Sequence, residues 1–374
     1  MNINKERVLK EFVELASIDS PSFNEREIAD VIIGKAGAIG LSVYEDKGCE
    51  VYGGNTGNLY FTMEGDPNVP SLMMMAHIDT VLPCTNKKIT IEGDVIKSDG
   101  TTILGGDDVA GIVSILETLR LVKEQNLAHG NIEVVLTFGE EHSLCGSKVL
   151  EFDKIKSKIA LVLDGGEPIG TAAIIGPSQY QIEARFKGKA AHAGIEPEKG
   201  INAIAIASNA ISNMKLGRLD FETTANVGLI SGGIATNIVS DNCVVKFEAR
   251  SIDAQKLENQ VVHMRQAIQA AADNFGGQVE IIQEFLYPSF NIAKDDELIK
   301  IFEESCVKIG VEPNLVSTGG GSDTNIISGK GIKAIDMSCG LTDAHTLNET
   351  MLVSDLLKCI ELTASIVQTL AGRE

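Results

Sequence analysis

The chain has 374 residues, an apolar share of 44% and a formal net charge of −20. Because single hydrophobic cores stop growing below this length, we expect roughly two domains. The negative charge disfavours nucleic acid and anionic membranes as partners, since phosphate binding needs clustered Lys and Arg.

Seven cysteines are scattered along the chain, and no two of them form a C-x-x-C pair. This distribution argues against a disulfide framework or a zinc knuckle and is typical of a reducing compartment. The first residues, Met-Asn-Ile-Asn-Lys-Glu-Arg, lack the apolar core of a signal peptide. No stretch approaches the roughly 18 apolar residues of a membrane span. We therefore expect a soluble, cytoplasmic protein.

The first part of the sequence predicts an α/β sheet. Residues 4–17 are predicted to form a helix, and Ser22 or Asn24 is a candidate N-cap for the next one. Strand-like and helix-like segments then alternate up to about residue 177, as in an α/β fold. The helix after Asp107 and Asp108 is plain, because apolar residues recur there near helical spacing.

Beyond residue 177 the pattern changes to that of a second domain. Residues 180–186 alternate as a half-exposed antiparallel strand does. The helices and strands that we predict after it are 201–214 (helix), 225–231 and 238–250 (strands), 254–275 (helix) and 278–286 (strand). This β-α-β-β-α-β order predicts a ferredoxin-like domain. A helix at 295–309 and a buried strand at 332–337 resume the first pattern. We therefore expect an α/β domain of residues 1–177 and 292–374, interrupted by a lid of residues 178–291.

Residues that can bind metals stand where the predicted strands end. Four of the five clusters follow an apolar run, and the runs are 72–76, 132–138, 159–163 and 332–337. The clusters are His77-Ile78-Asp79, Gly106-Asp107-Asp108, Glu140-Glu141, Asp164-Gly165-Gly166 and Ala344-His345-Thr346. Strand ends form the rim of an open α/β sheet, where ligands bind. Two imidazoles and several carboxylates on one rim suit a pair of divalent cations such as zinc.

Each cluster alone also has a structural interpretation. Asp107 and Asp108 could simply be acidic residues at a helix N-terminus, and Glu140-Glu141 could be a solvated turn. In the functional interpretation, Asp107 bridges two cations, while one glutamate binds metal and the other transfers a proton to a leaving amine. Asp79 stands two residues from His77 on a strand end and could fix the orientation of that ring. Five such clusters in one chain favour the metal site.

The ordered set of these residues resembles the di-zinc exopeptidases and deacylases. That family includes peptidase T, glutamate carboxypeptidase, acetylornithine deacetylase and succinyl-diaminopimelate desuccinylase. The resemblance covers essentially the whole chain, and residues 12–29 and 54–59 are similar to the peptidase T subgroup. It implies a zinc-exopeptidase catalytic domain, a mixed and largely parallel sheet flanked by helices, with an inserted ferredoxin-like α+β lid or dimerisation domain. It also implies two divalent metal ions, with Zn²⁺ favoured and Co²⁺ or Mn²⁺ as alternatives.

The metal ligands that the resemblance implies are divided between the two ions. His77 and Asp164 would hold one ion, Glu141 and His345 the other, and Asp107 would bridge them. Val109 and His142-Ser143 depart from the family pattern beside these ligands. Neither departure removes a ligand.

The resemblance further implies catalytic and substrate-binding roles. Asp79 would orient His77, and Glu140 would be the general acid and base. His192 would reach the scissile carbonyl oxygen, and in several relatives this residue comes from the neighbouring subunit of a dimer. The other substrate-binding residues that the resemblance implies are Asn237, Arg250 and Gly320.

We therefore predict a metal-dependent exopeptidase that hydrolyses short peptides and releases the N-terminal residue, with a metal-bound water activated by Glu140. A deacylase or carboxypeptidase with the same machinery, acting on N-acyl amino acids, is the alternative, because the pocket for a free terminus is not readable from the sequence. A metal-binding protein without catalysis is a third interpretation, against which the presence of both Asp79 and Glu140 argues. The expected partners are a short peptide and a second copy of the chain bound through the lid.

Overall fold

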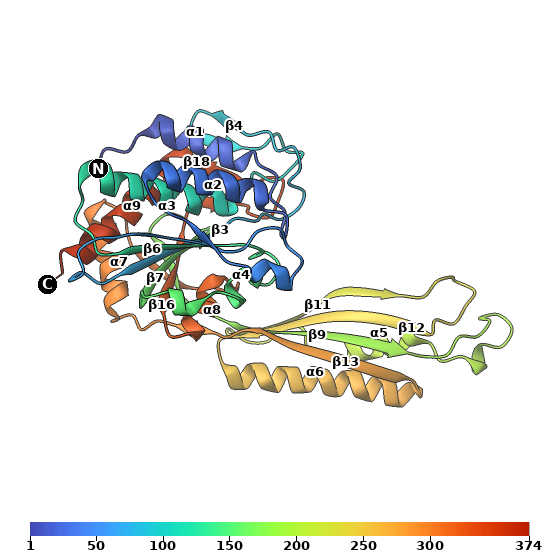
Figure 1. The fold of residues 1–374 in the computed structure, drawn as a ribbon. Coiled ribbons are helices and arrows are strands. Elements are labelled where there is room, and N and C mark those ends of the chain that lie inside the picture. Colours follow the sequence, from blue (N-terminus) through green and yellow to red (C-terminus); the bar gives the residue numbers. More distant parts are fainter. Residues whose placement is uncertain (374) are drawn as a thin grey trace. The chain divides into compact units, whose positions relative to one another are not determined.

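The computed structural model describes residues 1–373, which divide into two compact units (Figure 1). Unit 1 comprises Met1–Ile174, Asn291–Thr318 and the segment from Ser322 onward, and unit 2 comprises Ile175–Phe290 with Gly319–Gly321. The units divide at 174/175 and 290/291, whereas the sequence predicted boundaries at 177/178 and 291/292. The first division lies within strand β8 (Thr171–Gly176) and the second within strand β14 (Phe290–Asn291).

Unit 1 is built on a nine-stranded sheet. Its strands, in spatial order, are β1 (Tyr44–Glu45), β2 (Leu59–Met63), β6 (Ile132–Thr137), β3 (Leu72–His77), β7 (Ile159–Gly165), β16 (Lys333–Ser338), β8 and β14 (Phe290–Asn291), with β15 (Asn314–Ser317) paired to β8. The four central strands β6, β3, β7 and β16 are parallel, whereas β1, β2 and β8 pair antiparallel. Parallel strands are buried on both faces, which explains why their sequences are continuous apolar runs. The predicted α/β class with a largely parallel sheet is confirmed.

Helices cover both faces of this sheet (Figure 1). The helices of unit 1 are α1 (Lys5–Ala16), α2 (Arg26–Ile39), α3 (Gly106–Gln125), α4 (Cys145–Lys148), α7 (Glu297–Lys308), α8 (Asp323–Gly329) and α9 (Val353–Ala371), with the short 3-10 helices η1 (Gly48–Val51) and η2 (Phe152–Lys154). On one face α3 packs against β3 and β7, with α1, α2 and α9 around it. On the other face Ile327 of α8 packs with Met73 and Met75 of β3. Side chains of the central strands thus alternate between two cores.

Helix α3 lies in the interior of unit 1 because it is apolar on nearly all sides. Ile112, Leu116 and Leu119 are fully buried, as is almost every other residue between Gly106 and Val122. A helix that is apolar around its circumference is stable only when other elements surround it. The residues at its N-terminal end, Asp107 among them, are therefore carried by a rigid element.

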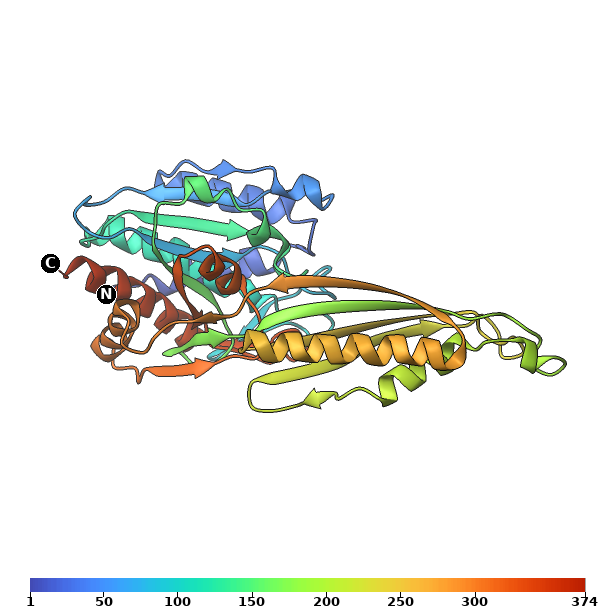
Figure 2. The ribbon, with the colours of Figure 1, turned by 90° about the horizontal axis from the view of Figure 1, so that it is seen from below.

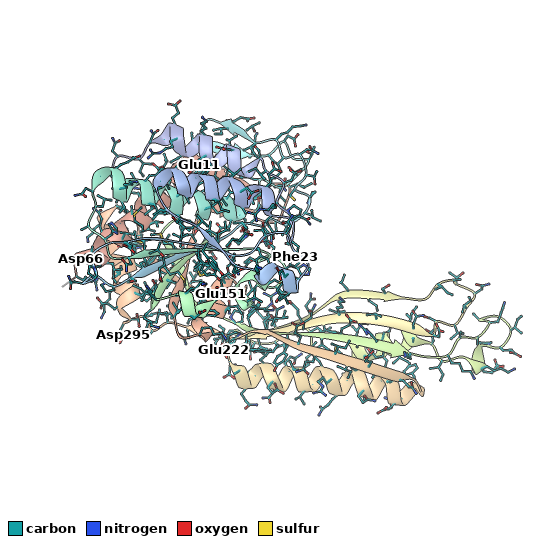
Figure 3. All side chains as sticks on the ribbon, in the orientation of Figure 1. Glu11, Phe23, Asp66, Glu151, Glu222 and Asp295 are labelled. Atoms are coloured by element: carbon teal, nitrogen blue, oxygen red, sulfur yellow. The ribbon has the colours of Figure 1, made fainter. Side chains whose placement is uncertain are left out.

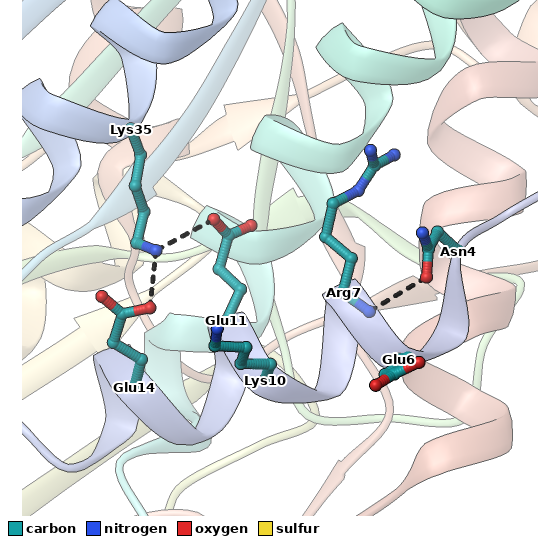
Figure 4. Close-up of a pocket in the computed structure, with 7 residues that line it drawn as sticks. All are labelled: Asn4, Glu6, Arg7, Lys10, Glu11, Glu14 and Lys35. Carbon is teal, nitrogen blue, oxygen red and sulfur yellow. Dashed lines mark hydrogen bonds and ion pairs between the residues drawn. The ribbon is translucent and has the colours of Figure 1, made fainter.

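Ion pairs connect α1 with α2 and α3. Figure 4 shows Lys35 of α2 beside Glu11 of α1, with the Nζ and Oε1 atoms 3.3 Å apart. From α3, Arg120 donates two hydrogen bonds of 2.7 Å to the carboxylate of Glu11. Arg7 of α1 reaches back to both carboxylate oxygens of the fully buried Glu117, at 2.9 and 2.8 Å. These pairs compensate two carboxylates that would otherwise be buried without a counter-ion.

A small four-stranded sheet in unit 1 carries one of the predicted metal ligands. Its strands, in spatial order, are β17 (Leu341–Thr342), β18 (Thr350–Leu352), β5 (Val95–Lys97) and β4 (Thr90–Glu92). The loop of residues 343–349 that joins β17 to β18 contains His345. None of these short strands was predicted, because two or three residues are too few to show a periodic pattern.

Unit 2 has the β-α-β-β-α-β order that the sequence predicts. Its sheet, in spatial order, consists of β10 (Gly217–Arg218), β11 (Thr223–Gly232), β12 (Asn242–Ser251), β9 (Ser178–Lys187) and β13 (Gln278–Tyr287), all antiparallel. Helices α5 (Ala203–Ser212) and α6 (Ala254–Phe275) pack on one face (Figure 2), and the short η3 (Pro197–Lys199) follows β9. The buried side of β12 alternates strictly, with Val245 and Phe247 in the core under α6.

Two local predictions were wrong. Neither Ser22 nor Asn24 caps α2, whose N-cap is Glu25 without a side-chain cap, because the Ser22 hydroxyl is bonded elsewhere. The strand expected at 238–250 begins only at Asn242, because the backbone N–H of Val239 instead donates to the carbonyl of Ala191 at 2.9 Å. In addition, among the helices of residues 1–373 none combines the length and apolar character needed to cross a bilayer.

Candidate metal centre

The carboxyl ends of the parallel strands bring the predicted metal ligands of unit 1 together. His77 is the last residue of β3, Asp164 lies near the end of β7, and Glu141 follows β6. Asp107 comes from the start of α3, and His345 from the loop between β17 and β18. Their donor atoms form two groups that share one residue, and within each group all donor atoms lie within 4.8 Å of one another. One group is His77, Asp107 and Asp164, and the other is Asp107, Glu141 and His345.

Asp107 occupies the centre of this arrangement. Its Oδ1 atom lies 2.9 Å from Nε2 of His77, while its Oδ2 atom lies 3.0 Å from Nε2 of His345. Nε2 of His77 is also 3.4 Å from Oδ1 of Asp164, and Nε2 of His345 is 2.8 Å from Oε1 of Glu141. Each oxygen of one carboxylate therefore faces a different imidazole, which is the geometry that a bridging ligand requires.

The charges at this site favour a bound cation. Burial and, next, the charge of Asp107 raise the pKa of Asp164 well above its usual value, and burial also raises the pKa of Glu141. For Asp107, burial is outweighed by hydrogen bonds with His345 and His77, which lower its pKa. Hydrogen bonds with Asp107 and Glu141 raise the pKa of His345 to about 10. Buried, crowded carboxylates with imidazole nitrogens at short range fit two divalent ions, because such ions stabilise the charged form of carboxylates that burial and mutual repulsion would otherwise disfavour.

Asp79 connects His77 to the two glutamates. Its backbone carbonyl lies 2.9 Å from Nδ1 of His77 and fixes that ring, leaving Nε2 toward Asp107. Its carboxylate accepts the backbone N–H groups of Glu140 and Glu141 at 2.9 and 3.3 Å. The side-chain oxygen of Asp79 lies farther from Nδ1, at 3.4 Å, so the carbonyl is the closer partner.

Asp108 differs in role from its neighbour, although the sequence does not distinguish the two. Its carboxylate accepts the backbone N–H groups of His77 and Gly111 at 3.1 and 2.9 Å. A Cβ atom at Gly111 would lie 2.4 Å from Oδ1 of Asp108, so this close approach requires glycine. The peptide bond between Asp107 and Asp108 is cis. Asp108 thus ties the start of α3 to the end of β3.

Residues with positive φ angles flank the ligands. His345 has a φ of 65°, and Ser143 and Leu144, just after the two glutamates, have φ angles of 66° and 60°. Such angles are costly for residues other than glycine, by roughly 1–3 kcal/mol each, and they cluster where function requires them. The backbone just after the two glutamates and at His345 is therefore held in place by its surroundings.

An aromatic contact that the sequence analysis missed braces the turn before Glu140. The ring of Phe23, labelled in Figure 3, lies 5.1 Å from the ring of His142 in an edge-on arrangement and 6.0 Å from the ring of Tyr52. A Cβ atom at Gly139 would lie 3.1 Å from Cε1 of Phe23. The departure of His142 from the family pattern was the available signal for this contact.

Two buried carboxylates near the site were also missed. Oε1 of Glu25 accepts the backbone N–H groups of Phe23 and Gly139, at 2.8 and 3.0 Å. The two carboxylate oxygens of Glu349 accept the backbone N–H groups of Gly105 and Asp107. Bonds between residues so far apart in the chain leave no periodic pattern in the sequence.

The predicted substrate-binding residues lie in unit 2, where they form two pairs. His192 forms a β-bridge with Ile238, and Ala193 donates its backbone N–H to the carbonyl of Asn237 at 3.0 Å, so His192 and Asn237 belong to adjoining segments. Arg250 donates from Nη1 to the carbonyl of Gly319 at 3.2 Å, beside Gly320.

The two pairs lie at opposite ends of the unit 2 sheet. Asn242, the first residue of β12, pairs with Lys187 just before the His192 segment, whereas Arg250 is near the other end of β12 and pairs with Gln179. Eight residue steps from Asn242 to Arg250 correspond to about 26 Å along a strand. Within one chain, unit 2 therefore does not bring His192 and Asn237 together with Arg250 and Gly320.

Comparison with known proteins places the chain among peptidases. The family model of peptidase family M20/M25/M40 matches residues 73–369. The chain is 41% identical over 369 residues to the uncharacterized protein YqjE of Bacillus subtilis, covering 99% of this chain and 100% of YqjE. It is 23% identical over 415 residues to peptidase T of Shouchella clausii, covering 99% of each.

Solved structures agree with these sequence matches. The aminopeptidase PepT from Bacillus cereus superposes with a TM-score of 0.90 at 41% identity, covering 99% of this chain and 100% of that one. A tripeptidase from Staphylococcus aureus superposes with a TM-score of 0.95 at 39% identity, again covering 99% and 100%. The chain therefore belongs to peptidase family M20/M25/M40, as the resemblance in its sequence predicted.

Proposed function

We propose that the chain is a metal-dependent exopeptidase that removes the N-terminal residue from short peptides. The observation that carries this proposal is the central Asp107, each of whose oxygens faces a different histidine, with the buried Glu140 close by. Aminopeptidase PepT and the tripeptidase, both about as long as this chain, support short peptides with a free amino terminus as the substrate class.

The proposed ligands divide between two ions. His77 and Asp164 would hold one, Glu141 and His345 would hold the other, and Asp107 would bind both. Imidazole and carboxylate donors suit Zn²⁺, and they also suit Co²⁺ or Mn²⁺. When bound, the ions would polarise the scissile carbonyl and lower the pKa of a water molecule.

Glu140 is the residue that would move the proton. Its neighbour Glu141 takes part in a ligand group, whereas Glu140 does not. Burial and, next, the charge of Asp164 raise the pKa of Glu140 well above its usual value. Such a carboxyl group can accept a proton from the attacking water, hold it and deliver it to the leaving amine. Asp79 would keep the Glu140 backbone in place for this transfer through its 2.9 Å hydrogen bond.

A second copy of the chain would complete the substrate site. An extended tripeptide spans only about 10 Å, whereas His192 and Arg250 lie at opposite ends of the unit 2 sheet. If both residues contact one short peptide, different copies must supply them. Exposed apolar side chains on β11 and the loop after it offer a surface for dimerisation, with Leu229 63% and Ile234 84% exposed.

Mixing two inactive variants tests this arrangement. His192→Ala and Glu140→Gln would each be inactive alone, but a mixed dimer would hold one intact site. After subunit exchange, about a quarter of wild-type activity should return if copies associate in pairs at random. No recovery, although an affinity-tagged copy of one variant co-purifies with the untagged copy of the other, would place His192 in the site of its own chain.

We also propose that the protein works in the cytoplasm. Its seven cysteines are buried and none of them is in a disulfide, which suits a reducing compartment. The proposed partners are thus a short peptide and a second copy of this chain.

The experiment that tests the activity is a substrate panel. Metal-free protein receives zinc, cobalt or manganese, and the release of free amino acids is followed with dipeptides, tripeptides, tetrapeptides and N-acetylated amino acids. Metal-dependent loss of the N-terminal residue from unblocked peptides is the expected result. Turnover of acylated substrates alone would instead identify a deacylase, and release from the carboxyl end a carboxypeptidase.

A further inference from the structure

Glu349 is a buried residue at the end of an exposed loop. Residues 345–348 are exposed, whereas Glu349 is only 1% exposed. Its Oε2 atom accepts the backbone N–H of Gly105 at 2.9 Å, and its Oε1 atom accepts that of Asp107 at 3.0 Å. One carboxylate thus holds both ends of the three-residue turn that leads into the bridging Asp107.

The turn is shaped to receive this carboxylate. A Cβ atom at Gly106 would lie 3.1 Å from Oε1 of Glu349 and 2.6 Å from Cδ2 of Leu341, so only glycine allows the approach. Gly105 has a φ of 73°, a conformation that favours glycine. The side chain of Lys87 is buried against Gly105, and its Nζ atom lies 2.9 Å from the position that a Cβ atom would take there. Carboxylate and ammonium therefore both lie close to the Gly105-Gly106 backbone.

Glu349 also belongs to the loop that carries His345. Glu349 follows His345 by four positions, and its backbone N–H donates to the carbonyl of Thr346 at 3.2 Å. The carboxylate therefore links the backbone of Asp107 to the loop of the exposed histidine, across 242 residues of sequence. We propose that Glu349 is a positioning residue, which sets the bridging carboxylate of Asp107 and the His345 loop in register so that both metal ions can be held at once.

A matched control exists elsewhere in unit 1. Glu133 is likewise a buried carboxylate, and it accepts the backbone N–H groups of Lys156 and Ser157 at 3.1 and 2.7 Å. It lies near the start of β6, whereas Glu140 and Glu141 follow the end of that strand. Glu349→Gln and Glu133→Gln each replace one carboxylate oxygen with an NH₂ group, which cannot accept a hydrogen bond from the backbone N–H that faces it. Both should lower the free energy of unfolding, but only the first should affect metal binding.

The experiment measures zinc affinity and stoichiometry in wild type, Glu349→Gln and Glu133→Gln, with urea unfolding of each as the measure of stability. We expect Glu349→Gln to lower zinc affinity by roughly 10–100-fold, as loss of a partner that orients a ligand does, while Glu133→Gln binds like wild type. With a tripeptide substrate, kcat should fall for Glu349→Gln while KM changes by less than about twofold.

Two outcomes would overturn the proposal. Wild-type zinc affinity in Glu349→Gln would make this residue a structural cap only, and equal weakening in both variants would show a general loss of stability. If Glu349→Gln does not fold, Glu349→Asp, which keeps the charge but is one methylene shorter, replaces it under the same criteria. The inference rests on the proposed metal site but not on the substrate. A failed peptide assay with intact zinc binding would therefore count against the peptidase proposal alone.

Discussion

The carboxylate of Asp79 accepts the backbone N–H of Glu140 at 2.9 Å, so a residue at the end of one strand fixes the proposed base at the end of the next. The same carboxylate accepts the N–H of Glu141 at 3.3 Å and the hydroxyl of Ser22 at 2.6 Å. His77, two residues before Asp79, contributes to the metal group. The backbone and the side chain of Asp79 thus position both His77, a proposed metal ligand, and Glu140, the proposed base.

Asp79→Asn should reduce both activity and metal affinity. In the variant, the side-chain NH₂ group of Asn would replace one of the two oxygens that accept the backbone N–H groups of Glu140 and Glu141. Two N–H groups would then face each other, so the Glu140-Glu141 turn would shift. We expect a loss of roughly 10–100-fold in kcat/KM and in zinc affinity, measured by kinetics and competition with a chelator. Ser22→Ala removes one hydrogen bond to Asp79 and should cost less than about tenfold. Unchanged kinetics in Asp79→Asn would contradict the positioning role.

The two ions should leave in a fixed order when metal is removed. The side chain of His345 is 52% exposed, whereas that of His77 is 2% exposed. Because solvent and chelator reach His345 more readily, the ion held by Asp107, Glu141 and His345 should be lost first. His345→Ala should therefore retain about one equivalent of zinc, which metal analysis after dialysis against a weak chelator would measure. Retention of two equivalents would show that His345 is not a ligand.

Arg120 should matter for stability but not for chemistry. It donates two 2.7 Å hydrogen bonds to Glu11, whose side chain is only 5% exposed. Arg120→Met would leave that carboxylate with Lys35 alone and should lower the free energy of unfolding by about 3 kcal/mol, measured by urea denaturation. The control is Lys97→Met, which breaks an exposed 2.8 Å pair with Glu92 and should cost less than about 1 kcal/mol. Equal effects of the two variants would contradict this account.

Glu25 should make stability depend on pH. Burial and, next, the charge of Asp79 raise the pKa of Glu25 to about 7. Because the folded protein holds this proton more tightly than the unfolded chain, the resulting stability is fully present below about pH 4.5 and is lost as pH rises through about 7. Glu25→Gln carries no charge at any pH and lacks this loss.

The measurement is the free energy of unfolding of wild type and Glu25→Gln between about pH 5 and pH 8. A chelator is present throughout, because bound metal would add a pH dependence of its own. Relative to wild type, Glu25→Gln should gain stability as pH rises, on the order of 2 to 3 kcal/mol across the range. A difference that does not change with pH would mean that Glu25 titrates at its ordinary value.

The sequence predicted those parts of the fold and site that depend on local pattern. Continuous apolar runs identified the buried parallel strands, and polar residues at their ends identified the rim. His77 and Asp164 could be found in this way because each lies at the end of such a run. The alternation of residues 180–186, which lie in β9, likewise predicted an antiparallel strand at the start of unit 2.

Contacts between distant segments were not predictable in the same way. Glu349 bonds to Gly105 across 244 residues, and its neighbours in sequence form an exposed loop that gives no sign of burial. Ser22 is a candidate helix cap in the sequence, but a serine hydroxyl can bond either to a nearby backbone group or to a distant carboxylate, and here it donates to Asp79. Asp107 and Asp108 are adjacent and chemically identical, and only the backbone geometry separates their roles.

The most direct test of the account is a comparison of Glu140→Gln with wild type in the same assay and the same metal analysis. Glu140 is buried and belongs to neither ligand group, so the variant should hold two equivalents of zinc with wild-type affinity while kcat on a tripeptide falls by roughly 10²–10⁴-fold. Near-wild-type turnover in Glu140→Gln, or loss of zinc in proportion to loss of activity, would contradict the assignment of Glu140 as the acid and base of a two-metal peptidase.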